Sequence, residues 1–213
     1  MEVLGLMKRS VLQQIALFGG PLAWVVLGLV HPISDPDVGE DADVFLLLHV
    51  IQPILIGLLG YAVWTLVDGL PGLATKVARV AVVPFVLAYT AFESIVGIAK
   101  GVFIVESSNY SDAEQAAIQR VFDGDHWAGY LFYFAAGLSW LVAGVAVAIA
   151  VRQIAPLYVS LLLGIGAAFF AVGHPKPPGP IGMTLFLIGV ALLELRYRPQ
   201  QATPETVVAP KPA

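Results

Sequence analysis

Glu93 lies near the centre of an apolar stretch, Val80–Val105, that has the length of a membrane-spanning helix. Glu93 and Lys100 are the only acidic or basic residues in that stretch. A carboxylate at the bilayer centre costs about 2.5–3.5 kcal/mol on insertion scales, so such a residue usually faces the protein interior and has a function. We therefore take Glu93, with Lys100, as a candidate catalytic acid or base, or as a ligand.

The chain has four histidines, each near one end of an apolar run: His31, His49, His126 and His174. Because cysteine is absent, a metal site would be built from imidazoles, carboxylates and backbone oxygens. Such a ligand set suits zinc, copper or iron. No two of these histidines have the i, i+3 or i, i+4 spacing of a local chelate, so a shared site requires convergence in the fold. Alternatively, each histidine anchors a helix end at the lipid headgroups.

Helical spacing assigns several polar residues to common faces. Tyr89, Glu93, Gly97 and Lys100 follow one another at steps of four, four and three, so they share one face of their helix. Gly97 lets a neighbouring helix approach this face closely.

The preceding apolar run has its own polar face, formed by His49 and Gln52, three residues apart. Charged groups facing lipid would have no partners, whereas a shared wet cavity satisfies them. We therefore expect one cavity, open toward the outer face, lined by His49, Gln52, Glu93, Lys100 and His126.

Composition indicates an all-α polytopic membrane protein. Of the 213 residues, 58% are hydrophobic and 12% are charged, compared with about 25% charged in soluble domains. Lipid must therefore cover much of the surface, and the bilayer is the first partner that the sequence predicts. The net charge of −4 gives no reason to expect a nucleic-acid partner.

Six apolar runs approach or exceed the ~20 residues that cross a bilayer. They are Val11–Val30, Val44–Val67, Val80–Val105, Trp127–Val151, Ile154–Gly173 and Pro180–Leu195. The last run is the shortest, and Gly19-Gly20-Pro21 predicts a kink within the first.

Basic residues predict the orientation in the cell membrane. They cluster at the termini and in alternate connections: Lys8, Arg9, Lys76, Arg79, Arg152, Arg196, Arg198 and Lys211. The other three connections contain only Arg120 and Lys176. The positive-inside rule then places both termini in the cytoplasm and all four histidines at the outer face.

Two segments fall outside the predicted spans. Residues 1–199 form the six-helix domain, and residues 200–213, rich in Pro, Ala and Thr, predict a disordered cytoplasmic tail. In the third outer connection, Ser111 and Glu114 have the spacing of a helix capping box. The residues that follow predict a short amphipathic surface helix that lids the bundle.

His-Pro after the first run, an acidic loop, His49 and the motif F-E-S-I-V-G-I-A-K-G around Glu93 resemble small polytopic membrane proteins of actinobacterial type. The resemblance covers the first three runs. It implies the helical bundle, and that group has no assigned activity that would define the chemistry.

Three functions fit these residues. The first is metal binding by the four histidines, with Glu93 deeper as acid, base or ligand, in a metal-dependent enzyme acting on lipid-like substrates or in a binding protein. The second is proton-coupled transport or sensing of an ionic ligand through Glu93, in an oligomer of this small chain. The third is b-type haem held between two histidines of facing helices.

Overall fold

The computed structural model describes residues 9–31, 41–123, 127–173 and 177–198. All regular structure in these ranges is helical. The first span is one continuous helical segment made of α1 (Val11–Gln14), a π-helical turn η1 (Ile15–Gly19) and α2 (Gly20–Val30). The π turn ends just before Pro21, so the predicted interruption takes the form of a wider helical turn.

The remaining helices follow the predicted order. They are α3 (Ala42–Leu66), α4 (Leu73–Phe92), the π-helical η2 (Glu93–Ala99), α5 (Lys100–Glu106), the 3₁₀ turn η3 (Ser107–Asn109), α6 (Asp112–Asp123), α7 (Trp127–Val151), α8 (Leu157–Val172), α9 (Pro178–Leu192) and the π-helical η4 (Leu193–Tyr197). From α4 through α5 the chain is a single helical segment.

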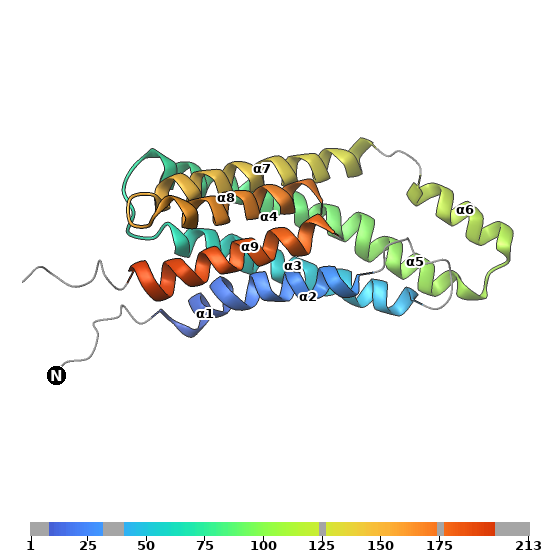
Figure 1. The fold of residues 1–213 in the computed structure, drawn as a ribbon. Coiled ribbons are helices and arrows are strands. Elements are labelled where there is room, and N and C mark those ends of the chain that lie inside the picture. The colour runs from blue at the N-terminus through green and yellow to red at the C-terminus, as the bar shows by residue number, and fades with distance from the viewer. Residues whose placement is uncertain (1–8, 32–40, 124–126, 174–176, 199–213) are drawn as a thin grey trace, which may run out of the picture.

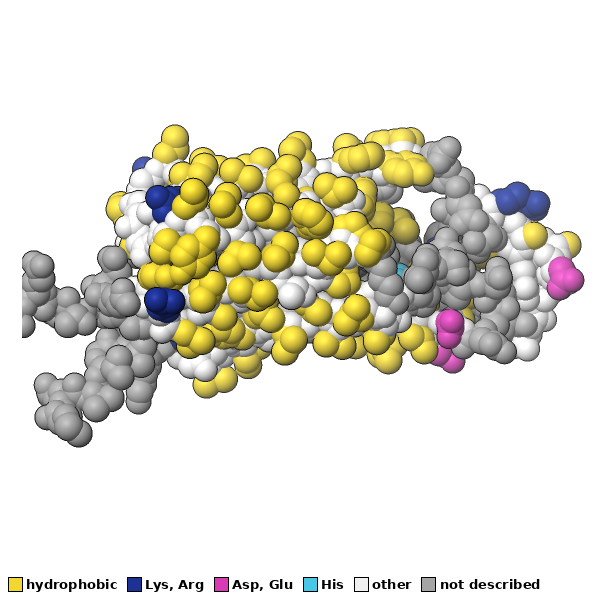
Figure 2. Space-filling view, viewed as in Figure 1, with side chains coloured by type: hydrophobic (Ala, Val, Ile, Leu, Met, Phe, Trp, Pro, Cys, Tyr) yellow, Lys and Arg dark blue, Asp and Glu magenta, His cyan; other side chains and the backbone are white. Residues whose placement is uncertain are grey.

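In the described part of the chain, five helical segments are long and apolar enough to cross a bilayer. They are Val11–Val30, Ala42–Leu66, Leu73–Glu106, Gly129–Val151 and Pro178–Tyr197. Large apolar side chains are exposed along these segments, and Figure 2 shows them covering the flank of the bundle while charged side chains gather toward its ends. These features support a multi-pass membrane protein.

The prediction that the sixth run is the shortest was wrong, since the shortest apolar helix is α8, with 16 residues. Pro156, with extended backbone, is the residue before α8, and Gly173 ends it, also in extended conformation. The last run is longer than expected because Pro178 occupies its first turn, where proline is tolerated, and η4 continues it to Tyr197.

The long helices form a closed ring in the order α2, α3, α4, α7, α8, α9 and back to α2. The pair α8 and α9 packs closely: a Cβ on Gly166 would lie 2.6 Å from the backbone nitrogen of Phe186, and one on Gly182 would lie 2.6 Å from the carbonyl oxygen of Gly166. Small residues thus bring the two backbones together, as is typical of membrane helices.

Aromatic rings fill the centre of the ring of helices. Trp24, Phe85, Trp140 and Phe186 are at most 1% exposed. The first and last described residues lie at the same end of the bundle, which we call the terminal end, and α5 and α6 extend from the opposite, far end (Figure 1).

The predicted surface helix is confirmed as α6. At its start, the Glu114 carboxylate accepts hydrogen bonds from the backbone nitrogen of Ser111 at 2.9 Å and from its hydroxyl at 2.6 Å. Figure 1 shows α6 beyond the far end of the bundle, and its role as a lid stays a prediction. The predicted disordered tail, residues 200–213, lies outside the described residues.

Candidate functional site

Glu93 begins the π-helical turn η2, within the long segment that α4 starts and α5 completes. Its exposed fraction is 0%, which confirms that it faces the protein interior. A π turn shifts the following residues around the helix axis, and such turns are frequent at functional sites. Here the turn lies between the buried Tyr89 and the buried Lys100.

The face predicted from the four-four-three spacing is confirmed by burial. Tyr89 and Lys100 are each 4% exposed, and Gly97 is also buried. The neighbouring element is α3, which contacts both η2 and α5. The face that carries Glu93 and Lys100 thus packs against α3.

The two polar residues predicted for one face of α3 both reach Glu93. With its amide nitrogen directed at the carboxylate, Gln52 donates to both oxygens of Glu93 at 2.8 Å each. Only the amide nitrogen can do this, since carboxylate oxygens accept hydrogen bonds and the amide oxygen has no hydrogen to donate. Nε2 of His49 lies 3.7 Å from Oε2 of Glu93.

A backbone carbonyl fixes the orientation of His49. Nδ1 of His49 lies 2.7 Å from the carbonyl oxygen of Phe45, one turn earlier in α3. Because a carbonyl oxygen only accepts, Nδ1 carries a hydrogen and donates it. The other ring nitrogen, Nε2, therefore faces Glu93 either with a proton, as imidazolium, or with its lone pair.

Gly97 makes room for the imidazole. A Cβ at this position would lie 2.1 Å from Cδ2 of His49, closer than any real contact, so only glycine permits this packing. One turn further on, a Cβ at Gly101 would lie 3.1 Å from the Cα of Leu46. The predicted close approach at Gly97 is therefore confirmed, and the residue it accommodates is His49.

Of the four histidines proposed as metal ligands, the structure brings two together. The rings of His31 and His49 contact each other edge to face, with centroids 5.1 Å apart, and both side chains are buried. His126 and His174 lie outside the described residues. Among the residues that the structure does describe, no three or more His, Cys, Asp or Glu side chains are placed to hold a metal ion.

The haem hypothesis gains nothing from the described histidines. A haem held by two histidines needs its flat macrocycle between their rings. His31 and His49 contact each other directly, which leaves no space for a macrocycle between them.

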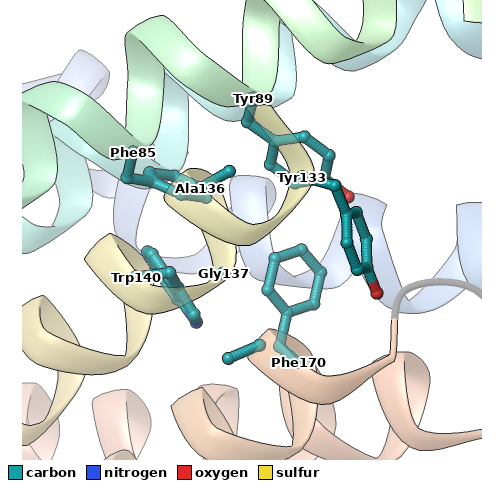
Figure 3. A pocket seen from close by; sticks show the side chains of 8 residues that line it. Phe85, Tyr89, Tyr133, Ala136, Gly137, Trp140 and Phe170 are labelled. Atoms are coloured by element: carbon teal, nitrogen blue, oxygen red, sulfur yellow. The ribbon is translucent and has the colours of Figure 1, made fainter. Parts of the chain in front are cut away.

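The expected polar cavity takes a different form. His49, Gln52, Glu93 and Lys100 are all buried, between 0% and 6% exposed, and the first three form a polar cluster around the carboxylate of Glu93. Its opening toward the far end stays a prediction. A crevice adjoins the cluster at Tyr89, one turn before Glu93, but its other lining residues are mostly aromatic (Figure 3). Tyr133 also lines this crevice.

Sequence reasoning missed a second polar cluster, at the terminal end. Arg9 lies 3.1 Å and Arg198 lies 2.8 Å from carboxylate oxygens of Glu194. Arg9 also donates to the carbonyl of Thr65, and Arg198 to those of Leu66 and Asp68, at and just beyond the end of α3. The one available signal was the i, i+4 spacing of Glu194 and Arg198.

Comparison with known proteins gives no match: no family model, no curated protein and no solved structure resembles this chain. The resemblance to small actinobacterial membrane proteins stays a prediction. The function must therefore be argued from the site itself.

Proposed function

We propose that the chain spans the membrane six times, with both termini in the cytoplasm. The sixteen residues of α8 extend about 24 Å at 1.5 Å per residue, somewhat less than a ~30 Å hydrocarbon core, a difference that local bilayer thinning can absorb. The helix also closes the ring between α7 and α9. Arg9, Arg79 and Arg198 lie at or near the terminal end, as the positive-inside rule requires of a cytoplasmic face.

We further propose that His49 and Glu93 form the proton-binding site of a protein that couples proton binding to transport or sensing. The observation that carries the proposal is the geometry of this pair. Glu93 is inaccessible to solvent, and Nε2 of His49 faces it at 3.7 Å while Nδ1 is committed to the Phe45 carbonyl. A proton exchanged between these two residues can therefore bind only to Nε2 of His49 or to the carboxylate of Glu93.

Loss or gain of that proton changes the charge of a buried site by one. In a medium of low dielectric constant, an uncompensated charge is costly, so the surroundings must rearrange or a counter-charge must approach. Lys100 lies two turns further along the same buried face, toward the far end. This coupling between protonation and arrangement is the basis of proton relays within membranes.

Gln52 gives the site its second property, since its amide fixes the carboxylate without titrating. The two hydrogen bonds from Gln52 hold both oxygens of Glu93 in place. A proton can then arrive or leave at His49 while the carboxylate keeps its orientation. This arrangement favours repeated exchange rather than a static ion pair.

The test uses purified protein in lipid nanodiscs and compares Glu93→Gln with Glu106→Gln, the same change at an exposed carboxylate of the same helical segment. Infrared difference spectra between pH 8 and pH 5 should show a buried carboxyl band that disappears in Glu93→Gln and persists in Glu106→Gln. Proton flux into proteoliposomes should fall with it. Wild-type spectra and flux in Glu93→Gln would overturn the proposal.

Metal binding is the second candidate, and one observation favours it. A ligating histidine almost always donates its other ring nitrogen to a carbonyl or carboxylate, as Nδ1 of His49 does to Phe45. His31 is the neighbouring imidazole, and since no three His, Cys, Asp or Glu side chains among the described residues are placed to hold a metal ion, the further ligands would have to be His126 or His174, as the sequence suggested. Elemental analysis of the purified protein should then give one metal per chain, reduced in a double variant of His49 and His126. A metal content that the double variant does not change would remove this candidate.

A further inference from the structure

The basic side chains at the terminal end differ in how fully the protein uses their hydrogen-bond donors. Arg9 and Arg198 pair with Glu194 and also donate to backbone carbonyls at the end of α3. Lys76 and Arg79, in the first two turns of α4, have far fewer contacts. Lys76 is exposed, and none of the residues that the structure describes forms an ion pair or hydrogen bond with it.

Arg79 keeps most of its donors unused. Its hydrogen-bond acceptor in the described part of the chain is Oδ1 of Asp68, at 3.4 Å, and its Nε is buried without a partner. A guanidinium has five N–H groups in a planar fork that matches the oxygens of a phosphate. Because the side chain is 35% exposed, an oxygen from outside the protein can reach the guanidinium.

The spacing of the two cations favours a bound anion. Lys76 and Arg79 are three residues apart, so their charges lie on the same side of α4. Neighbouring like charges on a helix repel each other. The exposed carboxylate of Asp68 partly compensates Arg79 and forms no ion pair with Lys76 among the described contacts. An anion between the two cations would relieve the remaining repulsion.

An aromatic ring indicates the depth of this position in the membrane. The guanidinium of Arg79 lies over the ring of Trp64, 5.3 Å from its centroid, and Trp64 is in the last turn of α3 and 45% exposed. Exposed tryptophans collect where the lipid headgroups meet the hydrocarbon. Figure 2 shows basic side chains at the terminal end beside a flank covered by apolar ones. A phosphate bound here would therefore lie at the level of the headgroups.

Apolar surface continues from the two cations toward the far end. At steps of four, three and four from Lys76, one side of α4 presents Val80, Val83 and Leu87. All three side chains are exposed. An acyl chain can lie along this stripe, whereas a soluble anion would gain nothing from it. The ligand that fits both parts has a phosphate at one end and a hydrocarbon chain at the other.

From these observations we infer that Lys76, Arg79 and Trp64 bind the headgroup of an anionic phospholipid, with an acyl chain along the apolar stripe of α4. The phosphate accepts hydrogen bonds from both cations. A zwitterionic lipid carries a positive group of its own, which the two cations repel. Basic pockets between membrane helices are a recognised type of anionic lipid site. The inference is independent of proton coupling, since it concerns the terminal end and not Glu93.

The experiment measures lipid binding to the purified full-length chain in detergent by native mass spectrometry. The probes are dioleoyl phosphatidylglycerol and dioleoyl phosphatidylcholine, which share their acyl chains and differ in net charge. Wild type should bind the first phosphatidylglycerol molecule about five- to tenfold more tightly, because each basic residue near a membrane surface contributes about fivefold in affinity. Equal affinity for the two lipids would overturn the inference.

Two double variants of equal charge locate the site. Lys76→Gln together with Arg79→Gln should abolish the preference for phosphatidylglycerol. Arg152→Gln together with Arg196→Gln removes the same charge from exposed side chains outside α4 and should keep the preference. An equal loss in both double variants would indicate diffuse attraction by surface charge and would refute the site. Lys76→Gln alone, at an exposed position that folding does not require, should weaken phosphatidylglycerol binding about fivefold.

Two further arms test the ring and the acyl chain. Trp64→Leu should weaken phosphatidylglycerol binding about two- to fivefold, the value of an exposed cation–π contact, whereas Trp127→Leu, the same change at an exposed tryptophan of α7, should have no effect. Equal effects of the two changes would contradict the role of Trp64. Glycerol 3-phosphate at the same concentration as the lipid should displace none of it. Displacement would indicate a site for soluble phosphate and would overturn the assignment to a lipid.

Discussion

Two buried carboxylates, in opposite halves of the bundle, differ in the partners that surround them. Glu194, at the terminal end, has a side chain that is 7% exposed and lies between the guanidinium groups of Arg9 and Arg198. Glu93 is 0% exposed and contacts an imidazole and an amide. A guanidinium keeps its charge at any physiological pH, whereas an imidazole gains and loses a proton there.

This difference separates a structural site from an exchange site. The charges around Glu194 are fixed, and its two arginines also satisfy carbonyls at the end of α3, so the cluster joins both termini of the described chain to the bundle. At Glu93 the charge of the partner is variable, and no arginine is among the partners described above. Burial alone therefore does not identify a functional carboxylate, and the chemistry of its partners does.

The largest expected effect follows from replacing Glu194 by Gln. Arg9 and Arg198, whose side chains are 12% and 20% exposed, would then lack a counter-charge. Breaking a buried pair typically lowers stability by about 3 kcal/mol or more. Unfolding in mixed micelles with SDS should show this loss of free energy, with the infrared band of the carboxyl at Glu93 retained. A variant as stable as wild type would contradict the structural role.

The matched change at the other site, Glu93→Gln, should lower the free energy of unfolding by only about 1 kcal/mol, the value of one hydrogen bond. The new amide oxygen still accepts from Gln52 and the new amide nitrogen faces Nε2 of His49, but the second hydrogen bond from Gln52 is lost because an amide nitrogen does not accept. Loss of the carboxyl band with only this small loss of stability would therefore complete the contrast. A destabilisation as large as that of Glu194→Gln, measured in the same micelles, would remove it.

Gly97 offers a way to disturb the exchange site without removing a titrating group. In Gly97→Ala the new Cβ overlaps His49, and such overpacking costs about 1–3 kcal/mol. His49 must move away from Glu93, so proton uptake on acidification should fall as well. Gly57→Ala is the control, because a Cβ there meets nothing within 4 Å. Unchanged proton uptake in Gly97→Ala would show that the distance from His49 to Glu93 is unimportant.

Local sequence patterns could predict the exchange site but not the structural one. Helical periodicity alone assigned Tyr89, Glu93 and Lys100 to one face, because residues within a helix have fixed relative directions. The pairing of Arg9 with Glu194 joins residues 185 positions apart, and no local pattern encodes such a contact.

Helix lengths, too, could be predicted only in part from local sequence patterns. Hydropathy predicted every apolar run, but the ends of α8 and α9 depend on backbone rules for Pro156 and Pro178 that an apolar window does not include. The aromatic crevice needed the ring order of the helices, since Phe85, Trp140 and Phe170 come from three of them. The cost of exposing polar groups to lipid thus predicted that His49 and Gln52 would meet Glu93, whereas no such cost predicted which aromatic residues share the crevice.

A third carboxylate, Glu114, gives an exposed reference for the comparison and the smallest expected effect. Hydrogen bonds from the hydroxyl and then the backbone nitrogen of Ser111 lower the pKa of Glu114. A lowered pKa in the folded helix means that the stabilisation is complete above the ordinary value of about 4.3 and is lost as the pH falls through the lowered value.

Hydrogen exchange in the first turn of α6 measures this stabilisation. Glu114→Gln should reduce protection at pH 7, and wild type should lose the same protection in strong acid, after correction for intrinsic exchange rates. Glu106→Gln should leave the turn unchanged. Protection that is independent of pH would mean that Glu114 contributes nothing to α6. Because solvent stabilises an exposed charge, the effect should also be weaker than at Glu194 and should decrease with salt, whereas the buried pairs respond to salt much less.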